Sequence, residues 1–318
     1  TRYFRESVAK YLSKRYPKAP EFFDVDDEIN PVPGTRTPLF QIGLLLKDGN
    51  KNKDISLVTN PFYHAWRAGG VAANKKIVWM NATSETNWLP ETQNIDSNIL
   101  RRSSIMYVAS PSNPHGSCAS IDWLIKTINQ CRKYDILLCV DECYADIYRE
   151  DGMPPSGTVE ALDKIGEGSK GVIIFHSLSK RSSAAGLRAG FIAGDKEVIS
   201  KYRQLTSNGG VAISEPQLRV AQALYNDDKH VEQIRSFYDG FIIEDCAHSC
   251  YVPGAGKKGD CAVWSFQAVK TMPCGDGGMI TTDDYDLYCK LKDMTWFGVS
   301  STWSRAKGLS GKPGYSWD

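Results

Sequence analysis

The feature that most restricts the fold is a regular alternation of short apolar runs and helical stretches along the first 230 residues. The apolar runs are nearly continuous in hydrophobic character, as in Ile136-Leu137-Leu138-Cys139-Val140, which is typical of strands buried on both faces. The predicted strands are residues 54–58, 77–80, 105–109, 136–140, 171–175 and 190–193. The predicted helices are residues 2–16, 38–46, 62–69, 120–133, 157–164, 196–206 and 214–226. Strands that alternate with helices predict an α/β fold, with a parallel sheet covered on both faces.

Polar side chains follow three consecutive predicted strands. Asn113 follows the third strand, and Asp141 and Tyr144 follow the fourth. Lys180 follows the fifth. Ligands of an open parallel sheet bind at the carboxyl ends of its strands, so we expect these groups to meet. An amine can form a Schiff base with an aldehyde, and a carboxylate can keep a ring nitrogen protonated. A phenol and an amide can hydrogen-bond a phenolate oxygen. This set indicates pyridoxal 5'-phosphate as the cofactor.

Candidate ligands for the phosphate of that cofactor lie in two further segments. Hydroxyl groups, a guanidinium and the start of a helix all suit a phosphate dianion. The candidates are Gly34, Thr35, Arg36, Ser177, Ser179 and Arg188. Tyr63, which follows Asn60-Pro61, offers an aromatic face that can stack on the cofactor ring.

Five motifs occur in a fixed order over roughly residues 1–240. They are PGTRTPLF, NPFYHAW, SNPHG, DECYADIY and SLSKRSSAAGLRAGF. This region resembles the class I and II, fold-type I, pyridoxal phosphate-dependent aminotransferases, and most closely their N-succinyldiaminopimelate aminotransferase-like branch. The resemblance implies a fold-type I large domain with a mostly parallel, seven-stranded sheet and helices on both faces.

The same resemblance implies a role for each candidate residue. Lys180 would form the Schiff base and carry the proton, and Asp141 would pair with the ring nitrogen. Tyr144 and Asn113 would hold the phenolate oxygen, and Tyr63 would stack on the ring. The phosphate ligands would be Thr35, Ser177, Ser179 and Arg188. His115 stands where the family commonly has threonine, which is a mild departure.

Residues 241–318 resemble a different group of fold-type I enzymes. The motifs IIEDCAHS, KKGDCAVWSFQAVK and GDGGMITTDD are similar to the middle of the DegT/StrS-type sugar aminotransferases. By that resemblance Asp245 would pair with the ring nitrogen and His248 would pack on the ring. Ser265 would contact the phosphate, and Lys270 would form the imine. The predicted elements here are strands at 241–243, 261–266 and 278–282 and a helix at 283–293.

These two resemblances predict four parts. Residues 1–33 form an N-terminal helix and linker, 34–210 the cofactor-binding large domain, 211–240 an interdomain helical region, and 241–318 a fragment of a second large domain. Four cysteines lie before the junction near residue 240 and five after it. We expect neither the N-terminal arm of the first family nor a complete small domain, and interpret the join as a chimera or a sequence assembled from separate pieces.

Composition excludes several other classes of protein. A net charge of +1 does not favour nucleic-acid binding, and no apolar run approaches the length of a membrane span. The first twenty residues have an amphipathic helical pattern without a signal-peptide core, which predicts the cytoplasm. The nine cysteines are predicted to be free thiols. Cys246, His248 and Cys250 lack the paired spacing of a zinc site, so we predict no metal.

The primary hypothesis is an aminotransferase of amino acid biosynthesis. It would move an amino group from an amino acid donor to a keto acid or keto/aldehyde acceptor through Lys180, and by analogy it would be a homodimer. One alternative places the chemistry at Lys270, on a nucleotide-linked keto-sugar. Another is a truncated or chimeric scaffold without catalytic activity.

Overall fold

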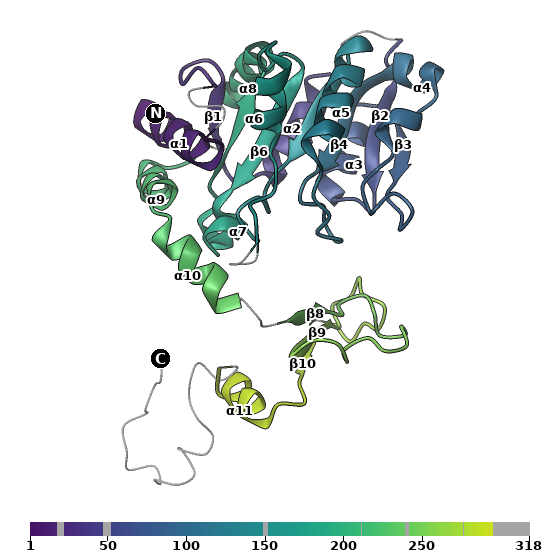
Figure 1. Cartoon of the computed structure of the whole chain (residues 1–318), viewed down its shortest axis with the longest axis vertical. Coiled ribbons are helices and arrows are strands. Elements are labelled where there is room, and N and C mark those ends of the chain that lie inside the picture. The colour runs from purple at the N-terminus through teal and green to yellow at the C-terminus, as the bar shows by residue number, and fades with distance from the viewer. Residues whose placement is uncertain are drawn as a thin grey trace. The chain divides into compact units, whose positions relative to one another are not determined.

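The computed structural model describes residues 1–17, 22–46, 52–148, 152–210, 212–238, 242–275 and 277–294. Contacts within the chain divide it into two units, Thr1–Ser236 and Phe237–Asp318 (Figure 1). The junction predicted at Gly240-Phe241 lies outside the described residues.

The first unit contains a seven-stranded sheet in the order β1-β7-β6-β5-β4-β2-β3. Its strands are β1 (Ile29–Val32), β2 (Ile55–Asn60), β3 (Lys76–Asn81), β4 (Ser103–Ala109), β5 (Leu137–Asp141), β6 (Val172–Ser177) and β7 (Gly190–Gly194). Strands β2 to β6 are parallel to one another, whereas β7 is antiparallel to both β6 and β1. The predicted seven-stranded, mostly parallel sheet is therefore confirmed.

Strand β1 is absent from the strands that the sequence predicted. It contains Pro31, and prolines around it indicated an interruption of regular structure. It forms the outer edge of the sheet, next to β7. Proline is tolerated on an edge strand because one side of that strand has no neighbour that needs its N–H group.

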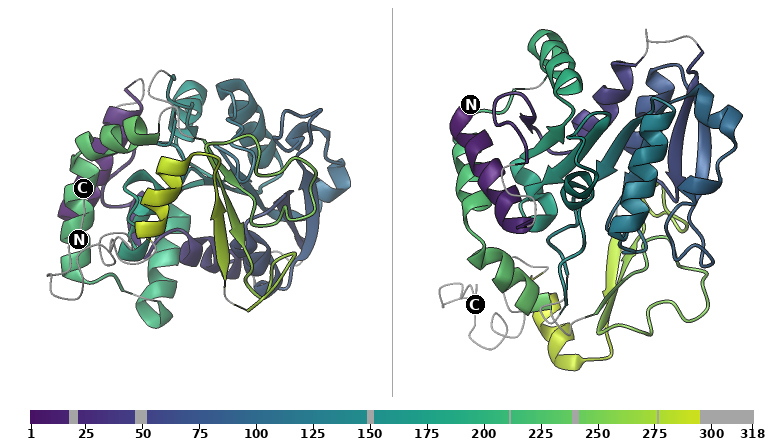
Figure 2. Two further views of the ribbon diagram at one scale, coloured as in Figure 1. Left: turned by 90° about the horizontal axis from the view of Figure 1, so that it is seen from below. Right: turned by 45° about the horizontal axis from the view of Figure 1, so that its top comes forward.

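Helices cover both faces of this sheet (Figures 1 and 2). On one face lie α1 (Arg2–Arg15), α5 (Ile121–Lys133), α6 (Thr158–Ile165) and α9 (Glu215–Asn226). On the other lie α2 (Arg36–Leu44), α3 (His64–Ala72) and α8 (Lys196–Gly209). We call these the α1 face and the α2 face. Shorter elements are α4 (Ser97–Arg102), α7 (Leu178–Arg181), α10 (Lys229–Tyr238) and the 3₁₀ turns η1 (Thr92–Asn94) and η2 (Ala185–Leu187).

Each central strand supplies side chains to both cores. Val140 and Ile174 pack in the core on the α1 face, and Cys139 and Phe175 pack in the core on the α2 face. This follows from the two-residue period of a strand, in which successive side chains point to opposite faces. Every residue of β4, β5 and β6 is buried, which agrees with their continuous apolar sequences.

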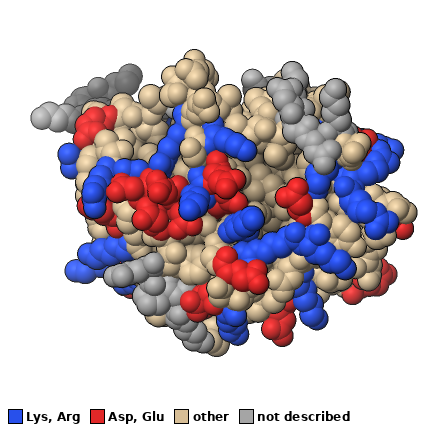
Figure 3. Space-filling view, turned by 90° about the horizontal axis from the view of Figure 1, so that it is seen from above, with Lys and Arg blue, Asp and Glu red and all other residues tan. Residues whose placement is uncertain are grey.

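The face seen from above in Figure 3 carries lysine, arginine, aspartate and glutamate side chains side by side. A cavity of about 510 Å³ near the amino ends of β5 and β6 has the same mixed lining, which includes Lys53, Arg132, Asp135 and Glu167. Charges of both signs partly cancel at such a surface, so it has no field of a single sign.

The second unit has a small sheet in the order β10-β9-β8. Its elements are β8 (Ile243–Asp245), β9 (Cys261–Ser265), β10 (Gly278–Thr281) and α11 (Tyr285–Met294). Strands β8 and β9 are parallel, and β9 and β10 are antiparallel. Among the described residues of this unit, the buried apolar side chains are those of Cys246, Cys261 and Ala262. This unit therefore has a much smaller core than the first.

Three further findings concern the described residues. The nine cysteines are all free thiols. None of the helices in the described ranges is both long enough and apolar enough to cross a membrane. No group of three histidine, cysteine or acidic side chains within those ranges is arranged to hold a metal ion.

Candidate active site

A pocket of about 240 Å³ opens at the carboxyl ends of β4, β5 and β6. It is lined by Thr35, Arg36, Tyr63, Trp66, Ala109, Asn113, Asp141, Cys143, Tyr144, Ser177, Ser179, Lys180, Ala185 and Arg188. Every residue that the sequence predicted for the first site lies on this wall except Gly34. The sheet brings these groups together from segments more than 100 residues apart because the ends of neighbouring parallel strands lie at one edge.

Asp141 ends β5 and is 8 % exposed. Burial raises the pKa of its carboxyl, although hydrogen bonding from Cys143, whose backbone N–H lies 3.2 Å from Oδ1, acts in the opposite direction. Among the described residues, Asp141 forms no ion pair. A buried carboxylate without a cation is unfavourable. A protonated ring nitrogen would supply that cation, so this position fits the cofactor.

The Lys180 amine lies over the ring of Tyr144 on the pocket wall. The Lys180 amine lies 5.5 Å from the centre of the Tyr144 ring, and the Asn113 amide donates to the Tyr144 hydroxyl at 3.2 Å. Burial raises the pKa of Tyr144, so its phenol stays protonated at neutral pH and can donate a hydrogen bond. The phenol and the amide therefore lie close to the Lys180 amine. This is the arrangement expected of groups that hydrogen-bond the cofactor oxygen next to an imine.

Hydroxyl groups gather where β6 passes into α7. The Ser177 side chain caps this short helix by accepting from the Ser179 N–H at 3.1 Å, and the two hydroxyls are 2.8 Å apart. Arg188 lies on the same wall, and its guanidinium donates to the carbonyl oxygens of Ala185 and Pro33. Two hydroxyls and a guanidinium form a suitable donor set for a phosphate.

Gly34 makes room for the guanidinium of Arg188. Its φ of +74° is in the left-handed region, and a Cβ built there would lie 2.4 Å from Arg188 Nη2. Glycine is therefore favoured at this position by the backbone conformation, and the absence of a side chain leaves the guanidinium of Arg188 in place. The sequence predicted Gly34 as part of a phosphate-binding helix start, and the structure places it behind a phosphate candidate.

Tyr63 lies on the wall but is held by its hydroxyl, which accepts from Arg36 Nε at 2.9 Å. Its ring meets that of Trp66 edge to face, with 6.1 Å between centroids. The sequence did not indicate Trp66 or Cys143 as site residues, although both lie inside quoted motifs. Cys143 Sγ is 3.1 Å from Thr35 Oγ1, and burial raises the pKa of the thiol. The aromatic and thiol groups thus pack the pocket wall.

The second predicted site is only partly brought together. Parallel pairing places Asp245 and Ser265 at the same ends of β8 and β9, and Lys270 Nζ lies 3.0 Å from His248 Nε2. Asp245 is exposed and accepts from the backbone N–H of Ala247 at 3.0 Å. Among the described residues of this unit, no hydrogen bond or ion pair joins Asp245 to Lys270.

Comparison with known proteins agrees with this geometry. Residues 2–240 match the family described as aminotransferase class I and II, which is three quarters of the chain. The chain belongs to this family. Residues 224–316 also match the DegT/DnrJ/EryC1/StrS aminotransferase family. Class I and II aminotransferases are pyridoxal phosphate-dependent enzymes of fold type I, so the predicted family, fold class and cofactor are confirmed at the level of the family.

Similar curated aminotransferases are about one quarter identical to this chain over the aligned region. It is 25% identical over 240 residues to LL-diaminopimelate aminotransferase 2 of Trichormus variabilis, covering 75% of this chain and 59% of that protein. It is 27% identical over 237 residues to LL-diaminopimelate aminotransferase of Halothermothrix orenii, covering 74% and 58%. The chain thus spans about three fifths of the length of these relatives.

Solved aminotransferase structures match the same region. An aminotransferase from Neisseria meningitidis superposes with a TM-score of 0.71 and 31% identity, over 75% of this chain and 60% of that one. The aminotransferase AspB from Helicobacter pylori gives 0.68 and 30%, over 75% and 61%. Both matches agree with the fold of the first unit.

Proposed function

We propose that the first unit is the cofactor-binding domain of an aminotransferase that moves an amino group from an amino acid donor to a keto acid or keto/aldehyde acceptor. The observation that carries this proposal is the placement of Lys180 and Asp141 on one pocket wall, with hydroxyls and Arg188 beside them. The names of the curated relatives favour diaminopimelate as the first donor to test, and a role in amino acid biosynthesis.

Each residue of the pocket has a task in this proposal. Pyridoxal phosphate, when bound, supplies a ring that stabilises negative charge at the α-carbon of the substrate. Asp141 would hold the ring nitrogen in its protonated form, and Tyr144, supported by Asn113, would donate to the ring oxygen. Thr35, Ser177, Ser179 and Arg188 would bind the phosphate.

Lys180 would act as both anchor and proton carrier. Its amine would hold the cofactor aldehyde in the resting enzyme and be released by the incoming amino donor. The free amine would then take the α-proton of the substrate as a general base and return it as a general acid to the carbon on the other side of the nitrogen, two bonds away. Its place beside Tyr144 keeps the amine on the side of the pocket where the ring oxygen would lie.

The first test is Lys180→Ala. We expect loss of the visible absorbance of lysine-linked pyridoxal phosphate and loss of transamination, because Lys180 is the one lysine among the described residues that line the pocket. Lys196→Ala is the control, since Lys196 is exposed at the start of α8. Persistence of both colour and activity in Lys180→Ala would contradict the proposal.

Borohydride reduction of the loaded wild-type protein, followed by peptide mapping, distinguishes the two candidate lysines. A pyridoxyl mass on Lys180 is expected. The same mass on Lys270 would favour sugar aminotransferase chemistry, because Lys270 contacts His248 in the segment that matches the sugar enzymes. Absence of both the mass and any transamination would favour a non-catalytic scaffold.

A homodimer, proposed by analogy with the family, is tested by sedimentation at low concentration.

A further inference from the structure

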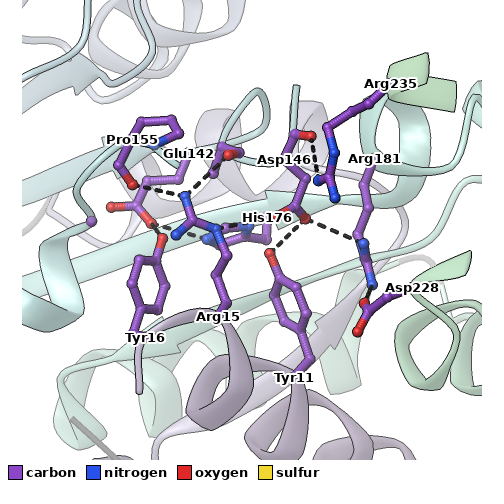
Figure 4. Close-up of polar contacts among 12 residues, drawn as sticks. Tyr11, Arg15, Tyr16, Glu142, Asp146, Pro155, His176, Arg181, Asp228 and Arg235 are labelled. Atoms are coloured by element: carbon purple, nitrogen blue, oxygen red, sulfur yellow. Dashed lines mark hydrogen bonds and ion pairs between the residues drawn. The ribbon is translucent and has the colours of Figure 1, made fainter. Parts of the chain in front are cut away.

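A buried polar network lies on the opposite side of the sheet from the pocket. By the alternation along β5 and β6, Asp141 and Ser177 share the α2 face, whereas Glu142 and His176 share the α1 face. Likewise Arg181, which follows Lys180, points into this network (Figure 4). Three pocket residues therefore have a direct chain neighbour that is fixed behind the pocket.

Glu142 is the anchor on the strand side of the network. It is 1 % exposed, and its Oε2 is 3.0 Å from both the Tyr16 hydroxyl and His176 Nε2. Its other oxygen accepts from the backbone N–H of Thr158 at 2.7 Å. A carboxylate with three partners is well solvated by the protein, so the segment that carries it is held in one position.

Asp146 is the anchor on the turn that carries Tyr144. It accepts from the Tyr11 hydroxyl at 2.8 Å and pairs with Arg15 Nε at 3.3 Å and Arg181 Nη1 at 3.5 Å. Tyr11 and Arg15 belong to α1, which thereby reaches the back of the site (Figure 4). Asp146 and both arginines are less than one tenth exposed.

Arg181 joins this turn to the helix that carries Lys180. Its guanidinium also pairs with Asp228 at 2.7 Å and lies 4.8 Å from the centre of the Tyr11 ring. Arg15 and Arg181 balance the charge of Asp146, and Arg181 also pairs with Asp228, so the loss of Arg181 or Asp146 weakens the compensation of buried charges. Such a loss is more disruptive than the loss of an exposed ion pair.

We propose that Arg181 is a positioning residue: through its pair with Asp146 it fixes α7 against the turn 142–147 and so sets Lys180 against Tyr144. Lys180 and Arg181 are consecutive on α7, and Tyr144 and Asp146 lie on one turn, closed by a hydrogen bond from the Ile147 N–H to the Tyr144 carbonyl. The pair behind the sheet therefore holds the 5.5 Å separation in front of it. The catalytic meaning of this inference rests on the proposed function.

Hydrogen exchange of the cofactor-free protein tests the positioning role directly. In Arg181→Gln and in Asp146→Asn we expect the amide of Ser182, the C-cap of α7, and that of Ile147 in the turn to exchange about tenfold faster, relative to amides of β2. Both amides donate hydrogen bonds inside the segments concerned. Arg219→Gln is the control, because Arg219 forms an exposed pair with Glu215 at 3.0 Å and should leave these amides unchanged.

Cofactor binding supplies the second measurement. We expect the dissociation constant for pyridoxal phosphate to rise about tenfold in both variants, because Lys180 is no longer held in place. The pH midpoint of the cofactor absorbance should move up in Arg181→Gln and down in Asp146→Asn, since the two changes remove opposite charges. A contribution to global stability alone would not move this midpoint.

Each outcome decides the inference. Exchange at Ser182 and Ile147 that accelerates no more than exchange in β2 would overturn it. If wild-type protein binds no pyridoxal phosphate, the proposed function fails while the exchange measurement still decides the role of Arg181. If Arg181→Gln does not fold, Arg181→Lys replaces it, because lysine keeps the charge with fewer donors and should give an intermediate acceleration of amide exchange. No acceleration of exchange in Arg181→Lys or in Asp146→Asn would overturn the inference.

Discussion

Replacing Gly34 by alanine should weaken cofactor binding much more than it weakens the fold. The new Cβ would lie 2.4 Å from Arg188 Nη2, and the end of this long side chain can move away. The backbone at φ +74° adds a strain of about 1 kcal/mol for a residue with a Cβ. We therefore expect the free energy of unfolding to fall by about 1–2 kcal/mol.

The expected effect on the cofactor follows from the displaced guanidinium. A hydrogen bond to a charged group contributes about 1.5–3 kcal/mol. Loss of the proposed contact between Arg188 and the phosphate should therefore raise the dissociation constant of pyridoxal phosphate by about 10- to 100-fold. Equilibrium titration of the cofactor absorbance and urea unfolding of the cofactor-free protein measure the two effects separately.

Gly166→Ala is a matched control for this experiment. Gly166 ends α6 with the same φ of +74°, and a Cβ built there meets nothing within 4 Å. Gly166→Ala should lower the free energy of unfolding through backbone strain alone, without any loss of cofactor affinity. If Gly34→Ala and Gly166→Ala bind pyridoxal phosphate equally well, Arg188 does not hold the phosphate and the reasoning is refuted.

Two further predictions concern buried carboxyls. Burial raises the pKa of Asp141, so the ionised carboxylate destabilises the folded state at neutral pH. Asp141→Asn should therefore raise the free energy of unfolding of the cofactor-free protein by about 1 kcal/mol while lowering its affinity for the cofactor. A less stable variant in urea unfolding would contradict this. Burial alone would raise the pKa of Glu142, but its hydrogen bond and charge interaction with His176 hold it below the ordinary value. The stability that Glu142 contributes is therefore present above the ordinary glutamate range and is lost as the pH falls through its lowered pKa, so Glu142→Gln should flatten the acid side of the stability profile measured by urea unfolding. An unchanged acid slope would count against this account.

The large domain was predictable because its signal is local. Continuous apolar runs such as Ile136 to Val140 need burial on both faces, and this requirement alone predicts a covered parallel sheet. The pocket residues were predictable because they follow strand ends and lie in recognisable motifs. Strand β1 was missed because an edge position, which makes Pro31 acceptable, is a property of the whole sheet and not of the segment.

The network behind the pocket could not be predicted in the same way. Glu142 and Arg181 are charged residues beside the site residues, and in sequence they are indistinguishable from solvated charges. Their burial depends on α1 and on Tyr16, which directly follows α1 and is 126 positions before Glu142. Trp66 and Cys143 were missed because an apolar ring or a thiol in a motif indicates packing as readily as a site, and only the fold places both on the wall.

The contact of α1 with a segment far along the chain has a consequence for synthesis on the ribosome. Lys14, near the amino end, and Arg181 both pair with Asp228, so the two contacts span 214 and 47 positions of the chain. A nascent polypeptide that has not yet exposed Asp228 has translated all of the pocket but holds Arg181 without its nearest carboxylate. Capture of pyridoxal phosphate should accordingly follow the emergence of this late aspartate, rather than that of Lys180 itself.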